Sequence, residues 1–301
     1  MAPVAFLLSY IFLGYCIEGD QIWYRKLYEA LSDANLFSAI DISIAHTGGA
    51  EPLSAIILWV GAYLGIPKDV YLSIINTLLI IGLYIFLRKN RVAVPMIFLL
   101  LSNFYIVVLI SFAERLKIAY LFLVLSELTG GKLRILLLFF SSLSHFQSII
   151  ILFCFSFLYF CKNIRKSLIS LELKSPRLNL LIVITVIGLV FYIYDYLIIK
   201  INAYLGSGDP LEVLKLILLI GIPLYISSRP YQMAIAILPL LPIVIIIGGT
   251  RINMIAFTIA IYFLVKERKM NNLLVYFLML YFSVKGLFFI EDVINTGQGF
   301  N

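Results

Sequence analysis

Charged residues are scarce in this sequence, and the shortage limits the classes of protein to which it can belong. Only 13% of its 301 residues are charged, 62% are hydrophobic, and the mean hydropathy is +1.05. A soluble core cannot bury that much apolar surface, so the composition predicts an all-α, polytopic membrane helical bundle. The apolar runs are too long and too continuous for the alternating strands of an outer-membrane barrel.

Histidine and cysteine are also rare. The two histidines, His46 and His145, are too few to favour a protein-built zinc site. The three cysteines (Cys16, Cys154 and Cys161) form no C-x-x-C motif and lie in or beside apolar segments. Cysteine in such surroundings usually acts as a small hydrophobic residue. We therefore expect no metal site and no cofactor.

The chain also lacks a polar region large enough for a soluble domain, since its longest polar stretch is about 18–51. The net charge of +7 does not indicate nucleic-acid binding, because the basic residues lie in short loops between apolar runs, as the positive-inside rule expects. The apolar run at 2–16 has no basic n-region or cleavage site, which favours a first membrane helix over a signal peptide. Residues 1–301 are thus expected to form a single integral membrane domain with an external loop at 18–51.

What the sequence does contain is a series of apolar segments, which predicts about 9–11 transmembrane or half-membrane helices. The segments are approximately 3–17, 52–66, 69–87, 92–112, 116–128, 133–160, 178–199, 211–226, 231–247, 252–265 and 272–290. Several are shorter than the ~20 residues that a helix needs to cross a bilayer. The segment 133–160 is expected to be either one long helix or two short helices broken near His145.

The distribution of basic loops predicts the orientation of the chain in the membrane. The basic loops 162–177 and 266–269 should be cytoplasmic, and the acidic loop 18–51 should be external. The sequence RKNR at 88–91 also looks internal, yet two apolar segments lie between it and the external loop. Either one of these segments does not span the membrane, or RKNR violates the charge rule. With RKNR inside, Arg115 falls outside, whereas a count of one crossing per apolar segment places Arg115 inside; the first placement is preferred.

The external loop begins with EGDQIWYRKLYEALSDANLF, which predicts a short helix lying on the membrane. Trp23 begins an apolar row at i, i+4 and i+8, and Tyr24 and Tyr28 lie beside it, which is typical of an interfacial anchor. The functional alternative is sugar binding, in which aromatic faces stack on sugar rings and Asp20 or Asp33 accepts hydrogen bonds from hydroxyls.

The same loop ends with HTGGAEP, in which a glycine pair precedes Glu51 and Pro52. Proline suits the first turn of a helix, and a carboxylate is favoured at a helix N-terminus. Glu51 is therefore either a simple cap or a functional carboxylate.

Arg115 is the strongest single signal, because it lies within the apolar stretch VVLISFAERLKIAYLFLVLSEL. An arginine stays charged at any working pH, and a charge at membrane depth costs about 2.5–3.5 kcal/mol. Arg115 must pair with an acid such as Glu114, reach lipid headgroups, or hold phosphate oxygens with its planar fork. Lys117 faces elsewhere on a helix and is a lesser candidate.

Two further motifs place polar residues in apolar segments. SSLSHFQS puts Ser141, His145 and Ser148 at i, i+4 and i+7, which predicts one polar stripe on one helix face. The stripe is either a helix–helix contact or a cavity wall, in which His145 could donate a proton near neutral pH. IGGTRINMIAF opens a helix with glycines and Arg251, which suits a phosphate site or an interfacial anchor.

The stretch YIYDYLIIKINAYLGSGDP ends a predicted helix at the outer face with Lys200 and Tyr204, and an aromatic belt is the alternative to a substrate site there. Arg115, Lys200 and Arg251 could together supply cations for a pyrophosphate. Aromatic residues for sugars and a membrane groove for a polyprenyl tail would complete a site for a lipid-linked glycan.

These motifs carry a family resemblance. In their order and spacing, GDQIWYRKLY, EPLSAIIL, ERLKIAYLFLVLSEL, SLSHFQSIIIL, KINAY and GGTRINMIAF resemble the EpsG-like and Wzy-type polysaccharide polymerases of bacterial membranes, over most of the chain. The resemblance implies a GT-C-like fold in the inner membrane with an active site facing the periplasm. It implies a metal-independent glycosyltransferase that joins undecaprenyl-pyrophosphate-linked oligosaccharide repeat units into O-antigen or a similar surface glycan. Membrane lipids and a protein that regulates chain length are the expected partners.

Roles for individual residues follow from their charges. The candidates for binding the departing pyrophosphate are Arg115, Arg251 and Lys200, because negative charge grows there in the transition state. Glu51 or Asp20 would accept the proton of the attacking hydroxyl, and His145 is the further candidate for this role. The candidates for sugar binding are Trp23, Tyr24, Tyr28 and Tyr204.

Other functions satisfy some of the same observations. A lipid-linked oligosaccharide flippase or other transporter would also need buried cations, but transporters often have repeated halves, and no internal repeat is found. An O-antigen ligase would use the same donor and differ only in its acceptor. A structural subunit without chemistry is disfavoured by the number of separated intramembrane cations.

Overall fold

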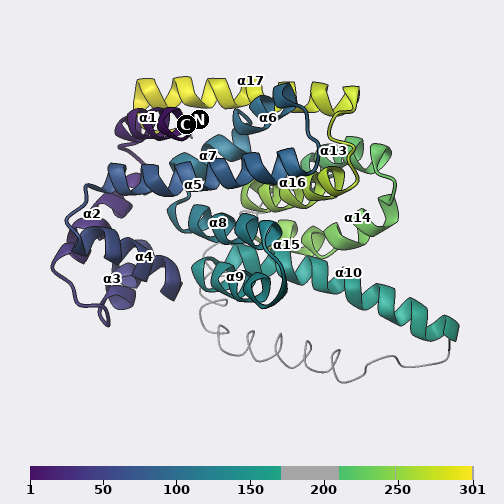
Figure 1. The fold of residues 1–301 in the computed structure, drawn as a ribbon, viewed down its shortest axis with the longest axis horizontal. Helices are drawn as coiled ribbons and strands as arrows, with labels where there is room; N and C mark the ends of the chain where they lie inside the picture. Colours follow the sequence, from purple (N-terminus) through teal and green to yellow (C-terminus); the bar gives the residue numbers. More distant parts are fainter. Residues whose placement is uncertain (171–209, 248, 300–301) are drawn as a thin grey trace. The chain divides into compact units, whose positions relative to one another are not determined.

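In the residues that it describes, the computed structural model has helices as its regular secondary structure, which confirms the predicted all-α class. Figure 1 shows the fold. The structure describes residues 1–170, 210–247 and 249–299. Side chains are described within these ranges except at 163–170, 210–212 and 245–251.

The described residues divide into two compact units. Unit 1 comprises Met1–Ile150 and Met270–Asn301, and unit 2 comprises Ile151–Lys269. The helices of unit 1 are α1 (Ala2–Tyr15), α2 (Asp20–Ser32), α3 (Ala39–Thr47), α4 (Pro52–Tyr63), α5 (Lys68–Lys89), α6 (Val94–Leu101), α7 (Phe104–Ser111), α8 (Glu114–Leu128), α9 (Gly131–Ser144) and α17 (Leu273–Thr296). Unit 2 contains α13 (Pro210–Ile226), α14 (Pro230–Ile237), α15 (Leu240–Ile247) and α16 (Gly249–Lys266), and α10 (Phe146–Ser170) crosses the boundary.

Among the described residues, α5 and α17 are each long and apolar enough to cross a membrane alone. Two bent pairs would raise the number of candidate spans from 2 to 4 if each pair counts as one. These pairs are α1 with α2, at 104°, and α6 with α7, at 54°. Shorter apolar helices such as α4 and α13 accompany them. By length and composition the helices are consistent with a multi-pass membrane protein, and the finer count of spans stays a prediction.

Several predicted segments are broken in the structure. The segment 92–112 forms α6 and α7, because the Asn103 side chain accepts a hydrogen bond from the Tyr105 N–H at 2.9 Å and starts a new helix. The segment 133–160 forms two helices, which confirms the second of the two alternatives predicted from the sequence. His145 is extended between them, with φ −162°, and its Nδ1 accepts from the Gln147 N–H at 3.0 Å.

The break at His145 overturns the expectation of one continuous polar stripe. Ser141 lies in α9 and Ser148 lies in α10, so the two serines are not on one helix face. They still meet, because the Ser148 hydroxyl donates to the Ser141 carbonyl at 2.7 Å. The Ser141 hydroxyl in turn donates to the Ala119 carbonyl of α8 at 2.9 Å. The serines therefore act as helix–helix contacts, which was the alternative interpretation of this motif.

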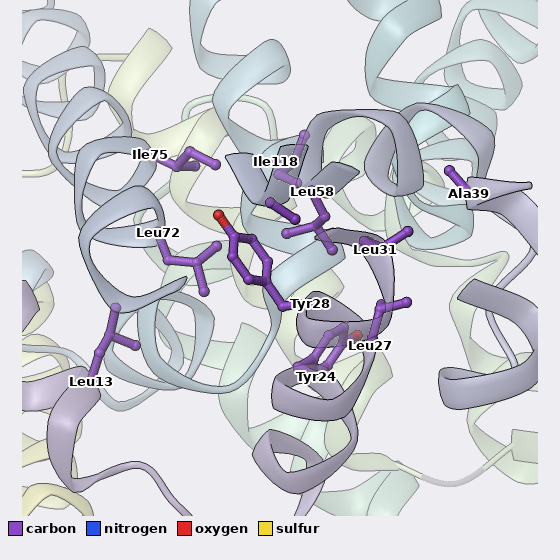
Figure 2. Packing of buried hydrophobic residues seen from close by; sticks show 11 residues of the cluster. Leu13, Tyr24, Leu27, Tyr28, Leu31, Ala39, Leu58, Leu72, Ile75 and Ile118 are labelled. Atoms are coloured by element: carbon purple, nitrogen blue, oxygen red, sulfur yellow. The ribbon is translucent and has the colours of Figure 1, made fainter. Parts of the chain in front are cut away.

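The apolar core around α2 positions the candidate site (Figure 2). Tyr24, Leu27, Tyr28 and Leu31 recur at helical spacing and are buried together. They pack against buried residues of α4 and α5. The predicted helix in the loop 18–51 is thus confirmed, but its tyrosine face is packed into the protein.

α17 and α5 run in opposite directions with α1 packed against both, and hydrogen bonds hold each end of α17 (Figure 1). At one end, the Asn271 side chain donates to the Arg91 carbonyl at 3.0 Å and accepts from the Ala93 N–H at 2.9 Å. At the other end, the Gly297 carbonyl accepts from the N–H groups of Ile17 and Glu18, at 3.2 and 3.1 Å. The start of α17 therefore lies beside the RKNR turn, and its end lies beside the end of α1.

The middle of α17 packs closely on the bend between α6 and α7. A Cβ at Gly286 would overlap the Ser102 carbonyl, so only glycine allows this approach. One turn further, Phe289 packs against Phe104 and Phe112 with ring centroids 5.5 and 5.7 Å apart.

Candidate functional site

Arg115, in the first turn of α8, is the centre of the candidate site. Its Nη1 forms an ion pair with the Glu51 carboxylate, and its Nε donates to the Tyr24 hydroxyl at 2.9 Å. The arginine side chain is 13% exposed and the glutamate side chain 4%. Side chains from α2, α8 and the start of α4 therefore converge, and the carboxylate in contact with Arg115 comes from 64 residues earlier in the chain.

The local sequence explains why Glu51 reaches Arg115. Glu51 is the N-cap residue of α4, which begins at Pro52 as predicted, but its side chain makes no capping hydrogen bond. The simple-cap interpretation is therefore wrong, because the carboxylate is directed to the guanidinium instead. Gly49 makes room for this contact, since a Cβ there would overlap the Arg115 guanidinium and lie 2.8 Å from Glu51 Oε2.

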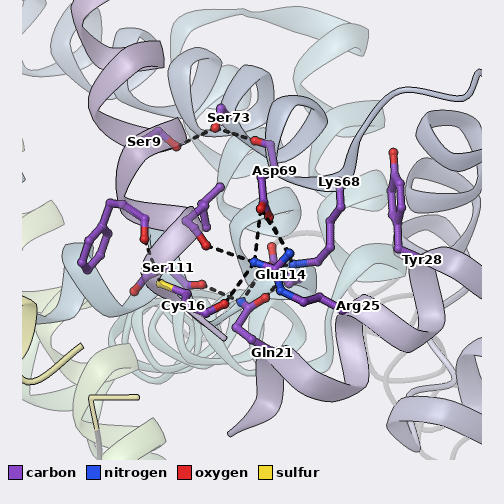
Figure 3. Close-up of polar contacts among 12 residues, drawn as sticks. Ser9, Cys16, Gln21, Arg25, Tyr28, Lys68, Asp69, Ser73, Ser111 and Glu114 are labelled. Atoms are coloured by element: carbon purple, nitrogen blue, oxygen red, sulfur yellow. Dashed lines mark hydrogen bonds and ion pairs between the residues drawn. The ribbon is translucent and has the colours of Figure 1, made fainter. Parts of the chain in front are cut away.

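Glu114, the residue before Arg115, belongs to a second polar group, which we call the Glu114 cluster: Gln21, Lys68, Glu114 and Lys117. Figure 3 shows Gln21, Lys68 and Glu114 close together. Glu114 is completely buried and lies 2.7 Å from Lys117 Nζ and 3.7 Å from Lys68 Nζ. Gln21 Nε2 donates to Glu114 Oε1 at 2.6 Å, and Gln21 Oε1 accepts from Lys68 Nζ at 2.6 Å. Burial of one carboxylate between two ammonium groups satisfies the rule that buried charges must be paired.

A third ion pair borders the cluster and caps α1. The Arg25 guanidinium contacts Asp69 Oδ2 at 3.1 Å and donates to the carbonyls of Leu13 and Cys16, at 3.1 and 3.2 Å (Figure 3). A cation is favourable at a helix C-terminus, where carbonyls lack helical partners. The N-terminus of α5 is therefore surrounded by buried or half-buried charges.

The other candidates in the loop 18–51 lie on α2 and differ in exposure. Asp20 is the first residue of α2 and is exposed. Trp23 is 52% exposed, and the Lys26 ammonium lies 5.1 Å from its ring centroid, which fits an interfacial anchor. The Tyr28 hydroxyl donates to the Ile66 carbonyl at 2.9 Å, and both Tyr24 and Tyr28 are buried. Trp23 is therefore the most accessible of the three aromatic candidates.

The remaining candidates belong to other parts of the chain. His145 is the residue between α9 and α10, as described above. Arg251 lies in the first turn of α16, which starts at Gly249 as the glycine motif predicted, but its side chain lies outside the described residues. Lys200 and Tyr204 also lie outside the described residues. Within the part of the chain that the structure describes, no group of three or more His, Cys, Asp or Glu residues is placed to hold a metal ion.

Sequence reasoning missed most of the Glu114 cluster. Lys117 was ranked below Arg115, yet it is fully buried and pairs with Glu114 at the i, i+3 spacing that favours ion pairs on helices. That spacing was readable from the sequence. Gln21 gave no such signal, because its partner Ser111 lies 90 residues away.

The site joins two chemical capacities. A guanidinium presents N–H donors in a rigid fork that matches phosphate oxygens, and an adjacent carboxylate can accept a proton. Comparison of the chain with models of protein families, with curated proteins and with solved structures found no match.

Proposed function

We propose that this chain is a membrane-embedded glycosyltransferase that polymerises lipid-linked oligosaccharide repeat units carried on undecaprenyl pyrophosphate. The observation that carries the proposal is the meeting of Arg115 with Glu51 and Tyr24. A partly exposed arginine beside a carboxylate is suited to hold a pyrophosphate leaving group and to accept a proton. The resemblance of the ordered motifs to bacterial polysaccharide polymerases supplies the substrate class.

The proposed orientation puts this pair at the periplasmic face. α4 has 12 residues and therefore covers about 18 Å, which is less than the ~30 Å of a hydrocarbon core. A non-spanning α4 allows the loop 18–51 to be external and the RKNR turn internal without violating the charge rule. Because Lys68 starts α5 and the RKNR turn lies at its end, the Glu114 cluster and Arg115 then lie toward the outer leaflet.

The proposed mechanism transfers the growing chain to the next repeat unit. A sugar hydroxyl of the incoming unit attacks the anomeric carbon of the growing chain. The bond from that carbon to the pyrophosphate breaks, and the lipid pyrophosphate leaves with the electron pair. Arg115 stabilises the charge that grows on the leaving group, and Glu51 takes the proton of the attacking hydroxyl. Binding of pyrophosphate would replace Glu51 at the guanidinium, which makes the carboxylate available to the hydroxyl.

The other candidate residues keep secondary roles in this proposal. Arg251 and Lys200 are the further cations for pyrophosphate, and Asp20 and His145 are the alternative bases. Trp23 is the aromatic residue best exposed for stacking on a sugar ring. Arg115 and Glu51 are therefore the principal residues of the proposed active site.

Deletion of the gene in its bacterial host tests the proposal. A polymerase mutant should leave single repeat units on the lipid A core, whereas a ligase mutant should leave none there. Arg115→Ala should abolish long chains at normal protein level, and Arg115→Lys should restore little, because an ammonium cannot bind bidentately. Arg134→Ala is the matched control, since Arg134 is an arginine of α9 that is 48% exposed. An unchanged ladder of surface polysaccharide in the deletion strain would refute the proposal.

A transporter of lipid-linked oligosaccharide is the second candidate, and the broken helices favour it. Transporters bind substrates at discontinuous helices, and α6–α7 and α9–α10 are each interrupted. Its signature in the same deletion strain would be repeat units trapped on the cytoplasmic side. The location of the accumulated units therefore separates the two functions.

A further inference from the structure

The interruption between α7 and α8 is stabilised by side chains that take over backbone hydrogen bonds. In a continuous helix, the carbonyls of Ile110 and Ser111 would accept from the N–H groups four residues later, at Glu114 and Arg115. Here α7 ends at Ser111 and α8 begins at Glu114. The Ile110 carbonyl accepts from Lys117 Nζ at 2.7 Å, and the Ser111 carbonyl accepts from Gln21 Nε2 at 2.6 Å.

Asn76 of α5 contributes to the same interruption. Its Nδ2 donates to the Ile110 carbonyl at 2.9 Å and to the Ser9 hydroxyl at 2.8 Å. The donor side chains are buried, and the carbonyls of Ile110 and Ser111 have each gained a side-chain donor. Lys117 differs from the other donors because it carries a charge, and a cation is favoured at the C-terminal end of α7.

Lys117 links the two sides of the interruption. Its ammonium contacts the last turn of α7 through the Ile110 carbonyl and the first turn of α8 through Glu114. Its side chain is fully buried, so water does not compete for these contacts. Lys117 and Glu114 therefore fix how the first turn of α8 departs from α7.

The direction in which α8 leaves α7 determines which residues the Arg115 side chain reaches. Glu114 is held toward α2 and α5 by Gln21 and Lys68, and Arg115 is directed to Glu51 and Tyr24. Restoring a continuous helix would turn the first residues of α8 relative to these partners. We infer that Lys117 is a positioning residue, which holds the α7–α8 interruption in the geometry that brings Arg115 to Glu51.

A cycle of substitutions tests this inference without depending on enzyme activity. Glu51→Gln, Arg115→Gln and the double variant are made in the wild-type chain and in Lys117→Met, and the melting temperature of each detergent-purified protein is measured. In the wild-type background the double variant should melt no lower than the worse single variant, because both remove one ion pair. In the Lys117→Met background, this coupling between Glu51 and Arg115 should fall to less than a third of its value in the wild-type background. Lys132→Met, an exposed lysine of α9, is the matched control and should leave it unchanged.

Lys117→Arg is a second test variant, because it keeps the positive charge. It separates the loss of that charge from a general failure to fold in Lys117→Met. It should retain at least half of the wild-type non-additivity. Retention of the full Glu51–Arg115 coupling in Lys117→Met would overturn the inference, and so would its complete loss in Lys117→Arg.

The role of Lys117 in activity rests on the proposed function, and a separate readout tests it. Lys117→Met at normal protein level should reduce long-chain polysaccharide at least tenfold, and Lys117→Arg should recover part of it. If the coupling responds as expected while gene deletion leaves the polysaccharide ladder unchanged, then the proposed function is wrong and the positioning role of Lys117 still holds.

Discussion

The two ends of α5 treat charge in opposite ways. At its start, Lys68 and Asp69 are drawn into buried or half-buried ion pairs with Glu114 and Arg25. At its end, a run of exposed basic residues leads into α6: Arg88, Lys89 and Arg91. Among the described residues, none of these three is in ion-pair contact with a carboxylate.

The two ends of α5 therefore depend on different partners. A buried charge is stable only while its counter-charge is present, so the start of α5 should tolerate few substitutions. An exposed basic turn is solvated by water or by lipid headgroups, so its stability should hardly depend on any one side chain. The start of α5 is therefore expected to control structure around Arg115, and its end is expected to control orientation in the membrane.

The largest expected effect comes from removing the carboxylate of the buried end. Glu114→Gln keeps the shape of the side chain but leaves Lys117 without its counter-charge and Lys68 with only the Asp69 carboxylate, at 3.9 Å. We expect the free energy of unfolding to fall by about 3–5 kcal/mol, measured by denaturant unfolding of the detergent-purified protein. Glu127→Gln on the same helix is the control, because its partner Arg134 is half-exposed, and it should cost about 0–1 kcal/mol. Equal losses in the two variants would show that burial does not distinguish these pairs.

A smaller loss is expected from crowding the Arg115–Glu51 pair. Gly49→Ala places a methyl group where the guanidinium lies, which should cost about 1–3 kcal/mol in unfolding free energy and shorten the polysaccharide chains. Gly130→Ala is the control, since a Cβ at Gly130 would meet nothing within 4 Å. Wild-type behaviour of Gly49→Ala would mean that Arg115 can move away from Glu51 at little cost.

The two Asn271 hydrogen bonds beside the basic end of α5 should contribute less to stability. Asn271→Ala removes both hydrogen bonds to the RKNR turn, each of which contributes about 0.5–1.5 kcal/mol to stability. Asn271→Asp keeps the acceptor for the Ala93 N–H and loses only the donor to the Arg91 carbonyl. Its melting temperature should therefore lie between those of wild type and Asn271→Ala, and any other order would contradict the two-bond description.

The smallest effect on stability, but a clear one on orientation, is expected from neutralising the basic end. Replacing Arg88, Lys89 and Arg91 together by Gln should change the unfolding free energy by no more than about 0.5 kcal/mol. It should also produce a fraction of inverted molecules. In a Cys161→Ser background, Glu18→Cys reports this fraction through an impermeant maleimide added to intact spheroplasts. Full labelling of Glu18→Cys both with and without the triple Gln substitution would show that these charges do not set the orientation.

The sequence predicted helices better than it predicted their interruptions. Apolar runs show where helices form, and Pro52 and Gly249 marked two helix starts correctly. The interruption after Ser111 could not be read locally, because the side chain that donates to the Ser111 carbonyl in place of a helical N–H is Gln21, from another helix. Helix breaks of this kind are determined by tertiary contacts and not by local propensity.

The candidate site was also only partly predictable. Arg115 and Glu51 were each singled out for their unusual positions, yet no local pattern joins residues 64 apart in the chain. Tyr24 was chosen as a sugar-stacking residue, and the structure buries its ring while its hydroxyl accepts from Arg115. Aromatic residues at helical spacing suit a core as well as a binding surface, and the sequence does not separate the two.

The packing of α17 has a consequence for how the protein is made. Phe289 fills the space beside Phe104 and Phe112, and Gly286 must approach the bend at Ser102, yet all of unit 2 is synthesised between these partners. Phe104 and Phe112 therefore lack their partner on α17 until the ribosome has synthesised the residues beyond unit 2. A chain that stalls within unit 2 would leave these rings uncovered, and exposed hydrophobic surface makes incomplete chains prone to aggregation.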